Sequence, residues 1–289
     1  MGIGSLNNFA VASPRIAVVT ATCNRLEGLQ RLHRSLSRQT VEVDWLHVLI
    51  DDASERRFEA SDVGSDPTVL EIHRNAENVG PLISRNTGID VAQSHGVDLI
   101  AFVDDDDYVT EDFFEYLVEE WRSRRNIGWF VSRCRYEGQN IPSCVDWPAE
   151  DGLFDWFRDV QVNRVLAGDA MHVVSSERLG TKRFSRLGRF QREWTLLARL
   201  AEEGPFYATD RVTKIVAYSS GGLTLQDRGR APDLISCWNH VSKTAVVLRA
   251  MPLSPRAWRM FCRQALLLPF RLTMLAYRSV GSAAVAFVS

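Results

Sequence analysis

The first 133 residues alternate between short apolar runs and segments with helical spacing, and this alternation constrains the fold most strongly. The apolar runs are typical of buried strands and cover 16–20, 45–50, 68–74, 98–103 and 127–133. Between them, apolar residues recur at the spacing of one helix face over 25–38, 81–96 and 110–124. Strands that alternate with helices in this way predict an α/β fold, in which helices flank a mostly parallel central sheet.

The limits of two predicted helices are marked by residues suited to helix ends. Pro81 fits a first helical turn, where a backbone N–H has no partner within the helix, and Gly96 fits a helix end. Thr110 precedes acidic residues that suit a first turn, so it is the expected N-cap of 110–124.

Two clusters of carboxylates directly follow predicted strands. Asp51 and Asp52 come after the second strand, and Asp104, Asp105, Asp106 and Asp107 come after the fourth. Ligands of such sheets bind at the carboxyl ends of the strands, so both clusters are expected at the same edge. The first pair alone would equally fit a solvated loop, whereas four consecutive acids repel one another and require a compensating cation.

A hard divalent ion, Mg²⁺ or Mn²⁺, is the cation that suits these oxygen ligands. Mg²⁺ is usually held by one or two carboxylates together with substrate phosphates, which favours a metal bridging a diphosphate. An EF-hand is excluded, because Val109 stands where its loop needs glycine and a strand precedes the cluster. A phosphatase-type Asp-x-Asp pair fits less well, because it would follow the first strand and precede threonine, whereas Tyr108 follows here.

Four motifs together resemble the landmarks of family 2 glycosyltransferases: VVTATCNR (18–25), LIDDAS (49–54), NVGPLISRNTGI (78–89) and FVDDDDYV (102–109). The resemblance implies a GT-A fold, with a catalytic domain over 14–225 divided into a nucleotide-sugar half (14–133) and an acceptor half (134–225). It also implies metal-dependent, inverting transfer of a sugar from a nucleotide-diphosphate sugar, with a UDP-sugar favoured. The expected acceptor is a glycan or lipid-linked molecule of the cell surface.

The resemblance also implies roles for residues of the nucleotide-sugar half. Thr20 and Thr22 would contact the nucleoside, Asn24 would cap the following helix, and Asp51 would accept the uracil N–H. Arg85 would face the diphosphate, as a guanidinium suits phosphate oxygens.

The family's Asp-x-Asp pair corresponds to Asp104 and Asp106. Asp106 is the expected direct metal ligand. Asp104 would lie nearer the ribose and is also a candidate metal ligand. Asp105 is expected among the donor-binding residues, and Asp107 would hold the loop. The chain departs from the family pattern at Ala21 and at Cys23, where many members have proline and a base-stacking tyrosine.

In the acceptor half, residues 134–165 correspond to a variable loop region that shapes the acceptor site in this family. The region is rich in turn residues and tryptophan, although Trp147, Trp156 and Phe157 also suit an aromatic core. Residues 166–179 predict a strand that runs into a short helix.

An inverting transfer needs a general base near the anomeric carbon. The family's Glu-Asp pair aligns with Arg192-Glu193, so Glu193 is the expected base, at the start of a helix over 191–203. The alternative is that Glu193 is only a first-turn acid stabilised by the helix dipole. Asp169 is the second candidate base. The family's histidine metal ligand is absent from 216–224, and His172 in an apolar strand suits core packing.

The segment 226–289 forms a basic tail on an acidic body. From Arg228 onward it holds nine Lys or Arg residues and one acid, Asp233. Residues 256–289 are hydrophobic but interrupted by arginines, which predicts helices lying on an anionic membrane surface instead of spanning it. Packing on the catalytic domain or in a dimer is the alternative, and no nucleic-acid partner is expected.

The predicted location is the cytoplasm, with the enzyme peripheral on the inner face of the cell membrane. An odd number of cysteines, five, without a CxxC pair favours a reducing compartment. Two other functions remain open at this point. One is a nucleotidyltransferase on a related fold, which would carry a glycine-rich loop that TATCNR lacks; the other is a non-catalytic GT-A relic that binds nucleotide or membrane.

Overall fold

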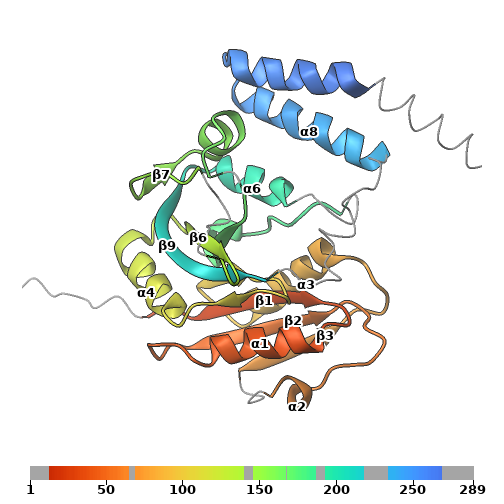
Figure 1. Ribbon diagram of the computed structural model, residues 1–289, viewed down its shortest axis with the longest axis vertical. Helices are drawn as coiled ribbons and strands as arrows, with labels where there is room; N and C mark the ends of the chain where they lie inside the picture. The colour runs from red at the N-terminus through yellow and green to blue at the C-terminus, as the bar shows by residue number, and fades with distance from the viewer. Residues whose placement is uncertain are drawn as a thin grey trace, which may run out of the picture.

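The computed structural model (Figure 1) describes residues 13–64, 69–139, 146–166, 168–186, 193–217 and 234–268. Several sequence-based interpretations lie wholly or partly outside the described residues. They concern Arg192, most of the motif at 216–224, part of the loop region 134–165, and the tail at 226–233 and beyond 268.

The amino-terminal half forms the parallel part of a nine-stranded sheet. Its strands run in the order β3-β2-β1-β4, and every neighbouring pair is parallel. They are β1 (Ile16–Thr22), β2 (Trp45–Asp51), β3 (Leu70–Arg74) and β4 (Leu99–Phe102). The helices of this half are α1 (Leu26–Leu36), the short α2 (Ala60–Val63), α3 (Pro81–Ser94) and α4 (Phe113–Arg124). The predicted α/β fold is confirmed, with every strand and helix expected up to residue 133 present.

The residues of β1 alternate between two hydrophobic cores, one on each face of the sheet. Ile16 and Val18 pack in the core that contains residues of α1 and α4, whereas Ala17 and Val19 pack in the core that contains residues of α3. All four are fully buried. A strand covered on both faces lacks the alternation of apolar and polar residues seen in half-exposed strands, which explains the unbroken run IAVV.

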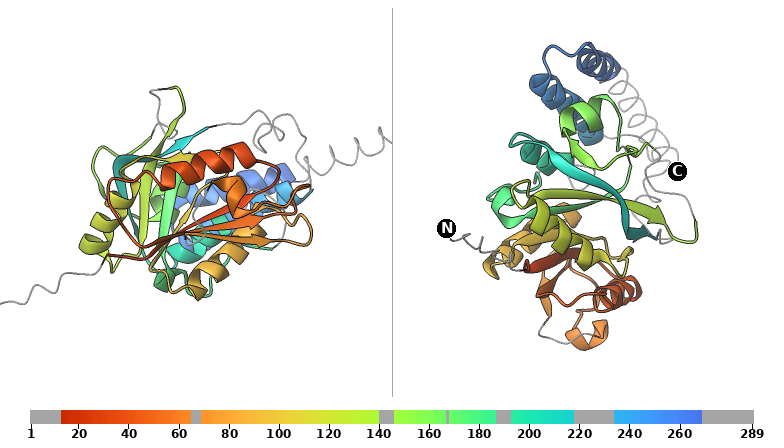
Figure 2. Two further views of the ribbon diagram at one scale, coloured as in Figure 1. Left: turned by 90° about the horizontal axis from the view of Figure 1, so that it is seen from below. Right: turned by 90° about the vertical axis from the view of Figure 1, so that its left-hand side faces the viewer.

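The other strands make the sheet mixed. Strand β8 (Ala170–Ser175) runs antiparallel to both β4 and β6 (Trp129–Tyr136), and β6 runs parallel to β9 (Phe206–Val216). The short strands β5 (Tyr108–Val109) and β7 (Gly152–Phe154) lie antiparallel to β9. Parallel pairing thus predominates in the nucleotide-sugar half, while one continuous sheet joins it to the acceptor half (Figure 2).

Thr110 is not the N-cap of α4, contrary to the sequence-based expectation. Its backbone N–H donates to Thr213 O at 3.0 Å, which extends the pairing of β5 with β9 by one residue. The helix consequently starts later, after Asp112, whose Oδ1 accepts a bond from the Thr110 hydroxyl at 2.5 Å.

Three short helices complete the acceptor half: the π-helix η1 (Trp156–Val162), α5 (Ser176–Leu179) and α6 (Trp194–Ala201). The predicted strand and short helix within 166–179 are confirmed by β8 and α5. Trp156 and Phe157 are buried in the core and Trp147 packs against it, so these aromatic residues do serve as packing.

The described part of the tail packs on the acceptor half. It comprises α8 (Leu234–Ala250) and a second helix at 255–268, the blue pair in Figure 1. Val247 and Ala257 are buried in the same core as Leu196 of α6. The indole N–H of Trp194 also donates to Asn239 Oδ1 at 2.8 Å. Of the two arrangements considered for the tail, packing on the catalytic domain is therefore present. None of the described helices combines the length and the apolar character needed to cross a bilayer.

Candidate active site

The four consecutive aspartates form a turn between β4 and β5 in which buried and exposed side chains alternate. The side chains of Asp105 and Asp107 are 9% and 5% exposed, whereas those of Asp104 and Asp106 are 49% and 20% exposed. The Asp107 N–H donates to Asp104 O at 3.1 Å and closes the turn. Asp105 and Asp107 thus face the protein interior, whereas Asp104 and Asp106 can contact a ligand.

The two buried aspartates fix the turn to the sheet. Asp105 accepts bonds from the Thr22 hydroxyl at 2.7 Å and from Arg25 at 3.0 Å. Burial nevertheless raises the pKa of Asp105 to about 6, although the charge of Arg25 acts in the opposite direction. Asp107 forms an ion pair with Lys214 at 2.8 Å and accepts the Ala217 N–H at 3.1 Å. The predicted loop-holding role of Asp107 is confirmed, and Asp105 is likewise bonded within the protein, to Thr22 and Arg25.

The two more exposed aspartates are held by arginines. Asp104 forms an ion pair with Arg85 of α3, and Asp106 forms one with Arg25 at 2.8 Å. Burial opposes ionisation of Asp104, but the charge of Arg85 holds its pKa below the usual value. The repulsion among the four acids is thus offset by Arg25, Arg85 and Lys214, and charge balance alone does not require a metal.

Helix α1 approaches this turn very closely. A Cβ placed on Gly28 would lie 2.3 Å from the backbone oxygen of Asp105, so this position requires glycine. The contact locates the turn relative to β1, and it explains why α1 can bring Arg25 within bonding distance of two of the aspartates.

Asp52 orients the helix that carries Arg85. Its carboxylate accepts the backbone N–H groups of Val79 at 2.9 Å and Gly80 at 2.8 Å, and the side-chain amide of Asn75 at 2.8 Å. Val79 and Gly80 immediately precede α3. The first carboxylate cluster thus contains one acid that organises the backbone, Asp52, and one that lines a pocket, Asp51.

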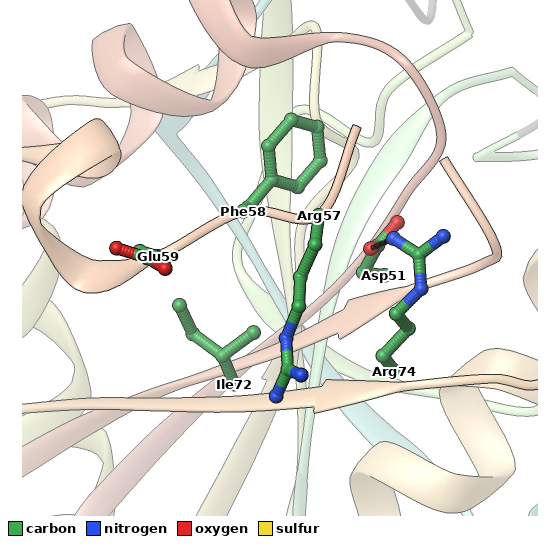
Figure 3. A pocket seen from close by; sticks show the side chains of 6 residues that line it. All are labelled: Asp51, Arg57, Phe58, Glu59, Ile72 and Arg74. Atoms are coloured by element: carbon green, nitrogen blue, oxygen red, sulfur yellow. Dashed lines mark hydrogen bonds and ion pairs between the residues drawn. The ribbon is translucent and has the colours of Figure 1, made fainter. Parts of the chain in front are cut away.

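A pocket of 440 Å³ lies beside the ends of β2 and β3 (Figure 3). Asp51 and Arg74 form an ion pair at one end, at 2.5 Å, and Phe58, Glu59 and Ile72 line the remainder around Arg57. Asp51 also accepts the Ser54 N–H at 2.9 Å. The pocket combines two carboxylates, two guanidinium groups and an aromatic ring, a set that suits a heteroaromatic ligand with N–H and carbonyl groups.

Three residues of the first motif make contacts within the protein. Thr20 is fully buried and its hydroxyl bonds to His47 at 3.1 Å, so its side chain is engaged in the interior. Thr22 is 3% exposed and its hydroxyl donates a hydrogen bond to Asp105. Asn24 does not cap α1, because its side chain accepts the Glu55 N–H at 2.8 Å. Asn24 instead ties the end of β1 to the loop after β2.

A second pocket, of 360 Å³, lies in the acceptor half and contains Glu193. Glu193 Oε1 lies 3.8 Å from Arg85 Nη1, so this acid is connected through Arg85 to the aspartate turn. Asp169, the second candidate base, is exposed and does not line the pocket, although its neighbours Gly168 and Ala170 do. His172 also lines it, and Nδ1 of its ring accepts the Trp129 indole N–H at 3.2 Å.

Residues 17–152 match the family model for glycosyl transferase family 2. The uncharacterized glycosyltransferase YwdF of Bacillus subtilis (strain 168) is 23% identical over 214 residues, covering 72% of this chain and 76% of that protein. The fold is similar to that of S. aureus TarS 1-349, with a TM-score of 0.64, 14% identity and coverage of 89% of this chain and 72% of that one. Its complex with UDP-GlcNAc gives a TM-score of 0.67, 14% identity and coverage of 87% and 71%.

The arrangement of the sheet is that of a GT-A fold, and the match over 17–152 identifies the protein as a glycosyltransferase. Residues 17–152 form a glycosyl transferase family 2 domain. The matched region contains all four expected motifs, which confirms the resemblance seen in the sequence. The family assignment also favours a glycosyltransferase over the nucleotidyltransferase and the non-catalytic relic.

Lys214 is expected to be essential for the stability of the aspartate turn. Changing Lys214 to Met leaves the Asp107 carboxylate buried without its charge partner, which should lower the free energy of unfolding by about 3–5 kcal/mol. Burial already raises the pKa of Asp107 while Lys214 is present, so without Lys214 the ionised form of this carboxyl becomes still less favourable. Urea denaturation at neutral pH measures the loss.

Lys182→Met is the matched control. Lys182 pairs with Glu203, but their side chains are 22% and 47% exposed, so the change should cost less than about 1 kcal/mol. Equal losses for the two lysine variants would contradict the account of the turn.

Proposed function

We propose that the protein is a metal-dependent, inverting glycosyltransferase that transfers a sugar from a UDP-sugar to a glycan or lipid-linked acceptor of the cell surface. The observation that carries the proposal is the position of Asp104, Asp106 and Arg85 at the edge of the sheet, with Glu193 close to Arg85. This arrangement supplies groups for a diphosphate and a base for an acceptor within one continuous site.

The nucleoside of the donor would occupy the pocket beside β2 and β3. Asp51 can accept an N–H from uracil, and Arg74 can donate to a uracil carbonyl oxygen. Phe58 and Arg57 also line this pocket and are candidates for packing against the base, where the chain has Cys23 in place of tyrosine. The complexes of TarS with UDP-GlcNAc and with UDP support the choice of a uridine donor.

The residues present fit a hard divalent cation, Mn²⁺ or Mg²⁺, bound together with the donor. Asp104 and Asp106 supply oxygen ligands from the more exposed positions of the turn. Within the described residues no three acidic, histidine or cysteine side chains form a metal cluster, so donor oxygens would complete the coordination. When bound, the ion would neutralise charge that develops on the leaving diphosphate. Arg85 would contribute a second positive charge there.

Glu193 would act as the general base. An acceptor hydroxyl attacks the anomeric carbon, its proton passes to the Glu193 carboxylate, and the bond between that carbon and the diphosphate oxygen breaks. Arg85 holds the carboxylate near the donor side of the site at 3.8 Å. Glu193 is favoured over Asp169 because it lines the pocket that an acceptor can enter.

The outer helix of the tail would contact an anionic membrane surface, and the enzyme would work on the cytoplasmic face. Trp258 and Leu266 in the helix at 255–268 are 50% and 79% exposed. Arg256, Arg259 and Arg263 occupy the same helix, a combination typical of interfacial helices. Packing on the catalytic domain does not conflict with this role, because the buried Ala257 anchors the helix while these apolar side chains stay exposed.

The metal role of Asp106 can be tested with UDP-GlcNAc and Mn²⁺. Asp106→Ala should lower turnover at least about 100-fold, since losing charge neutralisation worth several kcal/mol costs a factor of ten per 1.36 kcal/mol. Excess chelator should have the same effect on the unaltered enzyme. Asp90→Ala, which removes an exposed acid of α3 that pairs with Arg183, is the control and should remain active. Full turnover in chelator would refute metal dependence.

The role of Glu193 can be tested by Glu193→Gln, which keeps size and polarity but removes the basic site. The value of kcat should fall by roughly 10² to 10⁴, with donor affinity little changed. Glu193→Asp should retain part of the activity, because only reach is lost. The control is Asp169→Asn: if it abolishes activity while Glu193→Gln is near normal, the base is Asp169.

The membrane contact can be tested with vesicles that contain phosphatidylglycerol. Changing both Trp258 and Leu266 to Ser should weaken binding at least about tenfold, because burial of two large apolar side chains is worth a few kcal/mol. Leu253→Ser, which alters a 95% exposed residue outside the helix, is the control. Equal binding by the double variant and the unaltered protein would exclude this surface.

A further inference from the structure

The pocket around Glu193 is lined by elements that are far apart in sequence, among them η1, α6 and α8. Trp156 comes from η1, Trp194 from the start of α6, and Lys243 from α8 of the tail. Its volume of 360 Å³ falls in the range of roughly 300–1,000 Å³ that small-ligand pockets occupy. The tail therefore completes a cavity of the catalytic domain in addition to covering it.

Two cations line this cavity, the half-buried Lys243 and the exposed Arg164 on the loop after η1. Within the described ranges neither side chain forms a hydrogen bond or ion pair with another residue. Burial and the neighbouring charge of Arg164 lower the pKa of Lys243, whereas Glu193 acts in the opposite direction. An anion entering the cavity would relieve the repulsion between the two cations.

The backbone that presents Arg164 is held in an uncommon conformation. Arg164 and Leu166 have φ angles of 65° and 60°, in the left-handed region that residues other than glycine seldom adopt. The segment is kept in place by the bond from Leu166 N to Asp146 O at 3.0 Å and by the burial of Leu166. Strained backbone that the surrounding structure maintains is often found where a ligand binds.

We propose that this pocket binds an anionic saccharide acceptor, whose phosphate or carboxylate group is held by Lys243 and Arg164. The proposal rests on the proposed function and names the class of its acceptor. Glu193 lines the same cavity and lies 3.8 Å from Arg85, so a hydroxyl of a bound saccharide can reach the base on the donor side. Trp194 and Trp156 supply the apolar surface against which a sugar ring packs.

Glu193 also makes the two cations necessary for such an acceptor. A carboxylate lining the cavity repels an anionic ligand, and the two positive charges that also line it must outweigh that repulsion. Lys243 reaches the cavity from α8, which is fixed to α6 by the bond from Trp194 to Asn239 at 2.8 Å. Selectivity for the acceptor thereby depends on the tail as well as on the GT-A domain.

Binding to the full chain, measured by tryptophan fluorescence without donor, tests the proposal. The probes are glucose, glucose 6-phosphate and glucuronic acid at equal ionic strength, so that phosphate and carboxylate are compared with a neutral sugar. The unaltered protein should bind at least one anionic sugar at least tenfold more tightly than glucose. Lys243→Gln should lose that preference, and Lys243→Arg, which keeps the charge, should retain it.

Arg249→Gln is the matched control, because Arg249 lies exposed on the same helix and does not line the pocket. It should bind all three probes as the unaltered protein does. Equal affinity for glucose and both anionic sugars would overturn the proposal, as would an undiminished preference in Lys243→Gln. Hydrolysis of UDP-GlcNAc is measured in parallel: its absence would count against the proposed function, while anionic binding lost on Lys243→Gln would still support the pocket assignment.

Discussion

The ion pair between Asp107 and Lys214 is the interaction on which the site depends. It joins the aspartate turn to β9, a strand from the acceptor half, within a part of the protein where both side chains are less than 10% exposed. Together with the bonds from Thr22 and Arg25 to Asp105, it fixes the two inward acids. Because side chains alternate along the turn, fixing these two directs Asp104 and Asp106 toward the ligand side.

Ion pairs of Arg85 connect the two halves of the enzyme. Arg85 lies on α3 in the nucleotide-sugar half, pairs with Asp104 of the turn, and lies close to Glu193 at the start of α6 in the acceptor half. A guanidinium with two carboxylate neighbours is strongly held, and it lies where donor phosphates and acceptor hydroxyl would meet. The helices of the tail extend this chain of contacts through Trp194 and Asn239.

The sequence predicted the fold and the acidic edge because both follow from local patterns. Unbroken apolar strands and helical spacing identified the α/β half, and the position of Asp51 and of the four aspartates after strands located the edge correctly. The individual roles were harder to predict. Thr20 faces the core because its hydroxyl has a partner in His47, and nothing in the motif around Thr20 indicates that partner. Lys214 lies more than a hundred residues from Asp107, so no local pattern in the sequence indicates that it balances the charge of Asp107.

A structure of the protein crystallised with UDP-GlcNAc and Mn²⁺ would test the central claim most directly. The account predicts uracil in the pocket of Asp51 and Arg74, the metal on Asp106, Asp104 or both, and the diphosphate beside Arg85 on the side that faces Glu193. A donor bound with its diphosphate away from these two aspartates, or with its anomeric carbon out of reach of the Glu193 pocket, would contradict it.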